Sequence, residues 1–209
     1  VTNFVGTCNV LQASRLHGVK KVMYSSTSSG YGLKNEIPLR EDMSRDCLNP
    51  YAVTKVAAED LVKMYYTLWD LPTVIFRYFN IYGDREPTKG QYAPVVGLFL
   101  KQNKNGEAMT IVGDGNQRRD FTNVADAVQA NMLAMESDSK EILAEVFNVG
   151  TGSNNSVLEL AQMISDNYTF IAPRLGEAQN TLADITKAKT LLGYNPTVKI
   201  SEWIKQKIT

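Results

Sequence analysis

The sequence predicts an α/β fold in which helices connect the strands of a parallel sheet. Apolar runs with strand-like composition at 20–26 and 73–79 flank a long helical segment that starts at Asn49-Pro50. This strand–helix–strand order is typical of parallel sheets, because a parallel crossover needs the length of a helix. The chain has 209 residues, 44% of them hydrophobic and 21% charged, which is enough for one good-sized domain or one and a half small ones.

The first predicted element is a helix over 1–17. Val5, Val10, Leu11 and Leu16 recur at roughly helical spacing, and no capping residue precedes them. The chain starts with valine and not with methionine. We therefore expect it to begin in the middle of a larger fold.

A strand, a polar loop, a second helix and a second strand follow. The run "KKVMYSS" is apolar and leads into a Ser/Gly cluster, as expected of a buried strand. Asn49 is a good N-cap and Pro50 is favoured at the first helical position, so a helix begins there and continues to about Trp69. A Leu-Pro pair ends it, and "TVIFRYF" is then a β-rich buried strand.

The pattern of predicted helices and strands changes at about Tyr92, where the second half of the chain begins. Helices are expected at 93–104, 125–135, 156–166, 182–194 and 200–208, and strands that end in glycine turns at 109–115 and 145–152. We expect residues 92–209 to form mainly a smaller lobe packed against residues 1–91, with some segments returning to the first part.

The composition argues against several classes of function. Basic and acidic residues balance at 22 each, which gives no electrostatic reason to expect nucleic acid or an anionic membrane as partner. No apolar run has the length of a membrane span and no signal peptide opens the chain, so we expect a cytoplasmic protein. Two cysteines and the single His17 offer too little for a disulfide framework, a metal site or histidine-based catalysis.

Tyr51 and Lys55 are the first candidates for catalysis. They are four residues apart on the long helix and share one of its faces. A phenol has a pKa near ~10, so phenolate at neutral pH costs roughly 4 kcal/mol. A cation one turn away and a helix N-terminus both favour the phenolate, which can then act as a general base. Taken alone, the pair is weak evidence, because many helices contain this spacing by chance and an ordinary surface pair is the more common explanation.

A hydroxyl cluster supports the catalytic interpretation. Ser25, Ser26 and Thr27 follow the strand that precedes this helix. The carboxyl ends of the strands are where open α/β sheets bind ligands. A flexible Ser/Gly loop is the alternative for this segment.

Six motifs occur in a characteristic order, namely "GTCNVLQASRLHGVKKVMYSSTSSGYG", "NPYAVTKVAAEDL", "RYFNIYG", "IVGDGNQRRDFTNVADAVQANMLAM", "VFNVGTG" and "LADITKAKTLLGY". The set covers essentially the whole chain. It resembles the extended short-chain dehydrogenase/reductase group, specifically the NAD-dependent epimerase/dehydratase family that includes UDP-glucose and UDP-N-acetylglucosamine 4-epimerases. The resemblance implies the C-terminal part of a Rossmann-like, doubly wound parallel sheet with a smaller α/β substrate-binding lobe.

The resemblance also implies roles for individual residues at a catalytic and cofactor site. Tyr51 matches the catalytic base, Lys55 its partner and a ligand of the cofactor ribose, and Thr27 the hydroxyl that binds the reacting sugar oxygen. Together with Tyr51 and Lys55, Ser25 and Tyr78 match positions that contact the cofactor, which is NAD.

The matching substrate contacts lie mostly in the second half. Ser26 and Asn80 match residues beside the nucleotide sugar, and Arg119 and Arg174 match arginines that grip its diphosphate, a role suited to a permanently charged, planar guanidinium. Arg118 remains an alternative to Arg119 in this role.

The same motifs indicate the reaction. The family's 4,6-dehydratases place Asp-Glu directly after the catalytic Thr, whereas this chain has Ser28 and Ser29, which cannot perform the same acid chemistry. This favours epimerisation at C4. Thr181 matches a pocket position where a small residue admits N-acetylated sugars, so UDP-hexoses and UDP-N-acetylhexosamines are the expected substrates. The alternatives are another NAD-dependent nucleotide-sugar enzyme, such as a dehydratase or reductase, and a truncated, non-catalytic nucleotide-sugar-binding fragment.

One family motif is absent from the sequence. No G-x-x-G-x-x-G follows a strand, whereas the family carries this NAD fingerprint near its N-terminus. We therefore expect the glycine-rich part to be missing from this chain, which leaves NAD binding by the chain alone open. Family members usually form homodimers through two helices of each subunit, which match 1–17 and 50–69 here.

Overall fold

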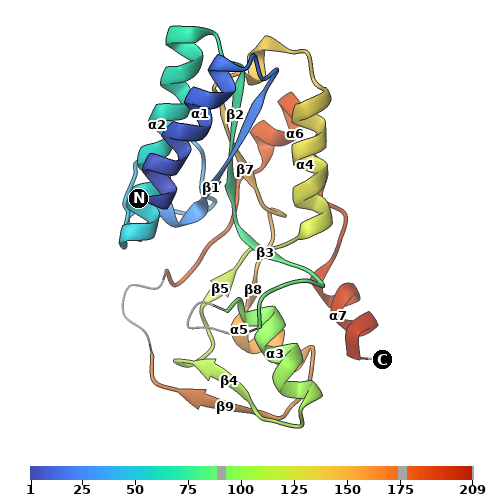
Figure 1. Cartoon of the computed structure of the whole chain (residues 1–209). Coiled ribbons are helices and arrows are strands. Elements are labelled where there is room, and N and C mark those ends of the chain that lie inside the picture. Colours follow the sequence, from blue (N-terminus) through green and yellow to red (C-terminus); the bar gives the residue numbers. More distant parts are fainter. Residues whose placement is uncertain (89–92, 174–177, 209) are drawn as a thin grey trace.

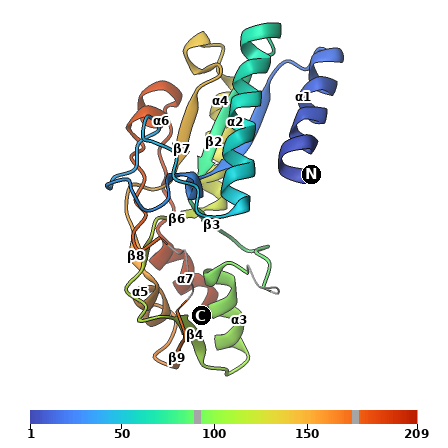
Figure 2. The same cartoon turned by 90° about the vertical axis from the view of Figure 1, so that its left-hand side faces the viewer.

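The computed structural model describes residues 1–88, 93–173 and 178–208. Its upper part is a parallel sheet with strand order β1-β2-β7, formed by β1 (Val22–Thr27), β2 (Thr73–Tyr78) and β7 (Val146–Val149). Helices α1 (Thr7–Leu16) and α2 (Pro50–Trp69) cover one face, and α4 (Val124–Glu136) and α6 (Thr186–Leu192) cover the other (Figures 1 and 2). The predicted α/β class with parallel strands is confirmed.

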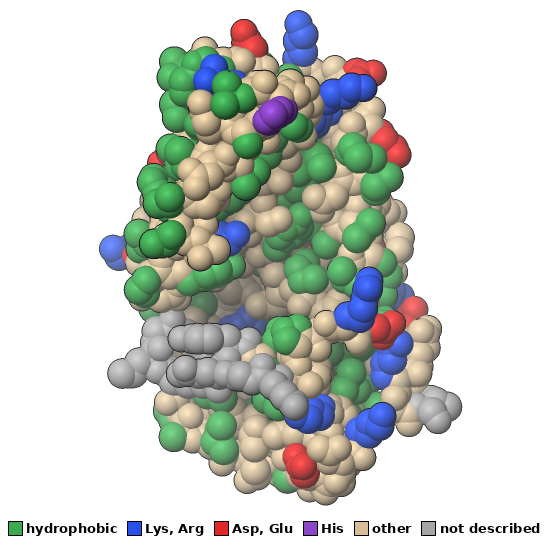
Figure 3. Space-filling model, viewed as in Figure 1, with side chains coloured by type: hydrophobic (Ala, Val, Ile, Leu, Met, Phe, Trp, Pro, Cys, Tyr) green, Lys and Arg blue, Asp and Glu red, His purple; other side chains and the backbone are tan. Residues whose placement is uncertain are grey.

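The order of these elements explains how the second half contributes to the first. α4, β7 and α6 all follow residue 92 in the sequence, yet they complete the sheet that β1 and β2 begin. Within the described residues β1 pairs only with β2, so its other edge is open. In Figure 3, which has the same view as Figure 1, hydrophobic side chains gather over α1 and α4. On α4 they are Val124, Val128, Met132 and Met135, which are 42–54% exposed.

Local signals determine the ends of α2. The Asn49 Oδ1 atom accepts a hydrogen bond from the Ala52 amide at 2.9 Å, and Pro50 is the first helical residue. The helix ends at Trp69 because Asp70 adopts a left-handed conformation, with φ 51°. Both ends agree with the prediction.

The opening helix differs in detail from the prediction. Residues Thr2–Gly6 form a π-helical turn, and α1 follows without a side-chain cap. The turn leaves Val5 49% exposed, and Val10 and Leu16 of α1 are 59% and 65% exposed. Of the four apolar residues that indicated this helix, only Leu11 is buried within the described chain, at 1% exposed, so the spacing predicted the helix but not a buried face for the other three.

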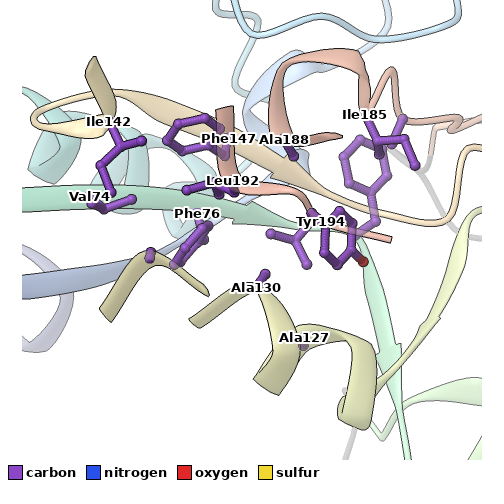
Figure 4. Packing of buried hydrophobic residues seen from close by; sticks show 14 of the residues in the cluster. Val74, Phe76, Ala127, Ala130, Ile142, Phe147, Ile185, Ala188, Leu192 and Tyr194 are labelled. Carbon is purple, nitrogen blue, oxygen red and sulfur yellow. The ribbon is translucent and has the colours of Figure 1, made fainter. Parts of the chain in front are cut away.

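The core between the sheet and the helices α4 and α6 is shown in Figure 4. Val74, Phe76 and Phe147 point from the strands toward these helices and are completely buried. α4 packs against them with the small side chains Ala127 and Ala130, and α6 with Ala188 and Leu192. The buried residues of this core are Tyr31, Leu39, Val74, Phe76, Phe79, Ala127, Ala130, Ala134, Ile142, Phe147, Val149, Ala183, Ile185, Ala188, Leu192 and Tyr194. Alanines at the contact allow the helix to approach the sheet closely, which favours dense packing.

The lower part has its own core. It contains α3 (Val95–Lys104), α5 (Val157–Gln162), α7 (Ile200–Ile208), a two-stranded sheet of β4 (Met109–Val112) and β9 (Tyr168–Ile171), and a small pair of β5 (Arg118–Arg119) and β8 (Asn155–Ser156). Phe99, Ile111 and Ile204 are completely buried there. β3 (Asn80–Tyr82) pairs in parallel with β6 (Phe121–Asn123), and the chain crosses between the two parts through these strands (Figure 1).

Two predictions for the lower part need correction. The helix expected to reach Asp166 ends at Gln162, because its last turn tightens: the amides of Ile164 and Ser165 both donate to the Ala161 carbonyl oxygen. Its start is as expected, with Ser156 and Glu159 forming a capping box. Strand β9 was not predicted, since three of its four residues are exposed and it is defined by its pairing with β4.

Candidate active site

The first two turns of α2 lie beside the carboxyl end of β1. The Lys55 ammonium donates a hydrogen bond to the Ser25 carbonyl oxygen at 2.7 Å and lies 5.2 Å from the centre of the Tyr24 ring. Burial lowers the pKa of Lys55. Tyr51, one turn earlier, is 49% exposed and accessible to a ligand. The structure thus joins Lys55 to the predicted hydroxyl segment, with Tyr51 one turn earlier on the same helix.

A buried ion pair between α2 and β2 stabilises the hydroxyl segment at the end of β1. Glu59 lies one turn after Lys55, is completely buried, and receives two hydrogen bonds from the Arg77 guanidinium, at 2.9 and 2.7 Å. The Ser26 hydroxyl donates to the same carboxylate at 2.5 Å. Ser26 is only 3% exposed. Its placement therefore does not support the predicted substrate contact, and we assign Ser26 to the support of the site.

Sequence reasoning missed Glu59 and Arg77. An arginine inside the apolar run "TVIFRYF" and a glutamate on the helical face of Tyr51 and Lys55 were the available signals. A buried arginine requires a buried acid, so the two could have been paired in advance.

The Thr27 hydroxyl lies at the end of β1, where a 3-10 turn (Ser28–Tyr31) begins. It accepts the Ser29 amide at 3.1 Å and contacts the Ser29 hydroxyl at 3.1 Å. Tyr78 is opposite Thr27 in the sheet register, and its hydroxyl accepts a hydrogen bond from the Asn131 side chain at 2.7 Å. Burial raises the pKa of Tyr78. Thr27 and Tyr78 therefore end adjacent strands at the same edge of the sheet.

Two cavities meet at Asn80 and Arg119. The smaller, of about 210 Å³, is lined by Ser28, Ser29 and Thr181 together with these two residues. The larger, of about 360 Å³, extends past Asn80 and Arg119 to the first turn of α3 and to β4. Because both residues border both cavities, the two cavities adjoin, and together they extend from the end of β1 to the lower part; we call the two together the groove.

The groove separates the two candidate arginines. Arg118 is committed to an ion pair with Glu159, at 3.0 Å, and to the side chain and carbonyl oxygen of Asn154. Arg119 borders both cavities, and one of its guanidinium nitrogens donates to the Arg118 carbonyl oxygen. The geometry therefore favours Arg119 over Arg118 as the ligand contact. Arg174 lies outside the described residues.

Thr181 borders the smaller cavity next to Ala178. Its hydroxyl oxygen is buried and has no hydrogen-bond partner within the described chain. Both side chains are small, so this wall leaves room for a substituent on a ligand. Among residues 1–88, 93–173 and 178–208, no group of three or more His, Cys, Asp or Glu side chains is placed to hold a metal ion. No helix in the same ranges is long and apolar enough to cross a membrane.

Comparisons with known proteins identify the family to which this chain belongs. The family model described as "NAD dependent epimerase/dehydratase family" matches residues 1–150. A putative UDP-glucose 4-epimerase of Methanocaldococcus jannaschii is 34% identical over 98% of this chain and 67% of its own length.

Solved structures of related epimerases have the same fold as this chain. The UDP-N-acetylglucosamine 4-epimerase of Methanobrevibacter ruminantium, in complex with UDP-N-acetylmuramic acid, superposes with a TM-score of 0.91 at 31% identity, over 99% of this chain and 67% of that one. The UDP-glucuronic acid 4-epimerase of Bacillus cereus, in complex with UDP-glucuronic acid and NAD, gives 0.89 at 35% identity, over 100% and 67%. The chain thus spans about 67% of the length of each.

Proposed function

Since this chain belongs to the NAD dependent epimerase/dehydratase family, we propose that it carries the catalytic and substrate-binding site of an NAD-dependent enzyme that epimerises a UDP-linked hexose or N-acetylhexosamine at C4. The observation that carries the proposal is the Tyr51–Lys55 pair at the start of α2, joined to the end of β1 by the hydrogen bond from Lys55 to Ser25. With a sugar bound at the end of β1, Tyr51 would serve as the base for its hydroxyl.

Lys55, Tyr51 and the open end of the sheet fit an NAD molecule. An ammonium group has three donors, and the hydrogen bond to Ser25 uses one of them. Lys55 would hold the nicotinamide ribose together with Tyr51, with Ser25 and Tyr78 beside them. When bound, NAD supplies a hydride acceptor that becomes a hydride donor, so C4 is oxidised and then reduced without net consumption.

The residues of the chain perform the proton transfer. Tyr51 as phenolate takes the proton of the sugar 4-hydroxyl while the carbon–hydrogen bond at C4 breaks, and it returns the proton when that bond re-forms on the other face. Thr27 holds the sugar oxygen by a hydrogen bond. Ser28 and Ser29 stand where a 4,6-dehydratase requires an acid and a base, which supports epimerisation over elimination of water.

The groove suits a nucleoside diphosphate sugar. The sugar would occupy the smaller cavity beside Ser28 and Thr181, and the nucleoside the larger, more apolar one. Asn80 and Arg119 border both cavities, and the diphosphate joins the same two parts of the ligand. A guanidinium at that junction suits its negative charge. Arg174 is proposed as a second diphosphate ligand on the resemblance alone.

Assembly and location are part of the proposal. The exposed apolar side chains of Val10 and Leu16 on α1 and of Val53 and Leu68 on α2, 51–65% exposed, support a homodimer formed through these two helices. Cys8 and Cys47 are both free thiols, which suits the reducing conditions of the cytoplasm.

The test combines binding with turnover. We expect the purified protein to bind UDP-glucose in calorimetry and, with NAD supplied, to interconvert UDP-glucose and UDP-galactose. Tyr51→Phe should reduce turnover by about a hundredfold or more while leaving UDP-glucose binding within about twofold, since it removes only the base. Binding without turnover would favour a non-catalytic nucleotide-sugar-binding fragment, and absence of binding would refute the proposal.

A further inference from the structure

Asp120 is a completely buried carboxylate that the proposed chemistry does not use. It lies between Arg119 and Phe121, in the segment that carries the chain from the small β5–β8 pair into β6. Burial raises the pKa of its carboxyl group, and the hydrogen bonds that its oxygens accept act in the opposite direction. A buried carboxylate is costly unless its oxygens are well supplied with donors.

The Thr122 hydroxyl, two residues away, donates a long hydrogen bond to Asp120 at 3.4 Å, and the shorter ones come from two segments far away in the sequence. One carboxylate oxygen accepts the Thr151 amide and the Thr151 hydroxyl, both at 2.8 Å. The other accepts the amides of Gly152 at 3.1 Å and of Ala183 at 3.2 Å. Hydrogen bonds to an ionised acceptor are stronger than neutral ones and fix geometry more tightly. Asp120 therefore joins the turn after β7 to the segment that precedes α6.

The connected segments carry the residues that line the smaller cavity. The Asp120 carbonyl oxygen accepts the Asn80 amide at 3.0 Å, and Arg119 is the preceding residue. Thr181, whose amide donates to the Arg118 carbonyl oxygen at 3.1 Å, lies two residues before Ala183. Asn80, Arg119 and Thr181 approach this cavity from three different segments. Asp120 contacts or adjoins each of these segments.

The packing around the carboxylate leaves little room for movement. A side chain at Gly150 would place its Cβ 2.4 Å from the Ala183 Cβ and 2.8 Å from a carboxylate oxygen of Asp120. Only glycine permits this approach. The segments around Ala183 and Gly150 are therefore pressed together against Asp120, and a change of hydrogen-bonding character there would be transmitted to the cavity wall.

We propose that Asp120 is a positioning residue for the nucleotide sugar, which acts by holding Asn80, Arg119 and Thr181 in the relative arrangement that binds the diphosphate and the sugar. The proposal rests on the proposed function, since it assumes a nucleotide-sugar ligand in the groove. Asp120 makes no contact with the ligand itself.

Asp126 offers a matched control. It is also a buried carboxylate, 2% exposed, and it also accepts two backbone amides, those of Thr197 at 2.9 Å and Val198 at 3.2 Å. It fastens the segment before α7 to α4 and borders neither cavity of the groove. A purely structural role predicts similar consequences for the loss of either carboxylate.

The experiment compares Asp120→Asn with Asp126→Asn. Each variant replaces one acceptor oxygen by a donor nitrogen that faces backbone amides. Binding of UDP-glucose is measured by calorimetry well below the melting temperature, and Tm by circular dichroism. We expect both variants to lower Tm, Asp120→Asn to weaken binding by about tenfold or more, and Asp126→Asn to change it by less than about twofold.

Equal affinities of Asp120→Asn and the unmodified protein, or equal losses in both variants, overturn the positioning role while leaving the proposed function intact. Failure of the unmodified protein to bind UDP-glucose overturns both. If Asp120→Asn does not fold, Thr151→Val removes a single hydroxyl donor at similar shape. A loss of about threefold or more is then expected, and unchanged affinity refutes the role.

Discussion

Arg77→Met tests whether the buried ion pair holds the catalytic end of the sheet together. Methionine keeps an unbranched side chain in the 6%-exposed position and removes the charge. Glu59, 0% exposed, then loses two charged donors and retains the Ser26 hydroxyl. Removing one partner of a buried ion pair costs about 3–5 kcal/mol, because the other charge remains buried without compensation.

A loss of stability near the lower end of this range is expected here, because a second cation remains near Glu59: the Arg45 guanidinium lies 4.0 Å from its carboxylate. The compensation is only partial, since the Arg45 side chain is 42% exposed and its charge is screened by solvent. A loss of about 3 kcal/mol corresponds to a fall in Tm of about 6–12 °C for a chain of this size. Urea unfolding followed by circular dichroism gives the free energy of unfolding directly.

Arg45→Gln is the control, because its partner Asp60 is 61% exposed and such pairs contribute about 0–1 kcal/mol. The double variant Arg77→Met/Glu59→Met removes both charges and should recover at least half of the loss. A loss below about 1 kcal/mol for Arg77→Met, or no recovery in the double variant, would refute the reasoning.

Three further predictions concern the cavity wall, a surface ion pair and a tight contact. Thr181→Tyr should abolish turnover of UDP-N-acetylhexosamines while sparing UDP-hexoses, since the aromatic ring would fill the space that the small Thr181 side chain leaves in the cavity. An equal loss of turnover for both substrates in a coupled assay would contradict this. The hydrogen bond from Arg45 lowers the pKa of Asp60, so this carboxylate stabilises the fold above its ordinary pKa and the contribution is lost as pH falls through and below that range. Arg45→Gln should raise the pKa of Asp60 in an NMR titration, and an unchanged pKa would exclude the ion pair in solution. Gly150→Ala should destabilise by about 1–3 kcal/mol in urea unfolding because the added methyl overlaps Ala183; a loss below about 0.5 kcal/mol would show that the contact yields easily.

Elements with strong local signals were predictable from the sequence. The bounds of α2 follow from an Asn cap, a Pro at the first position and the Leu-Pro pair that ends the helix. Strand β9 was not predictable in this way, because exposed residues give no alternation and the pairing with β4 joins residues far apart. Local chemistry determined the first element, and tertiary context determined the second.

In the candidate site, too, some residues could be predicted from local spacing and others depend on tertiary contacts. Tyr51 and Lys55 share a helix, so their common face followed from spacing alone. The roles of Ser26 and Asp120 depend on partners more than 30 positions away, Glu59 for the first and Thr151 and Ala183 for the second. The residues next to Ser26 in the sequence give no sign that its hydroxyl has an acceptor in Glu59.

The open edge of β1 determines how the site fluctuates. Ser25, Ser26 and Thr27 belong to a strand that has one neighbour in the described chain, whereas β2 has two. Backbone amides of β1 that point to the open edge should exchange with deuterium quickly, and those of β2 only through larger openings. Any chain that pairs with this edge would slow exchange in β1 and narrow the range of positions of the Thr27 hydroxyl. The rate of exchange at β1 therefore reports on how well ordered the proposed catalytic end of the sheet is.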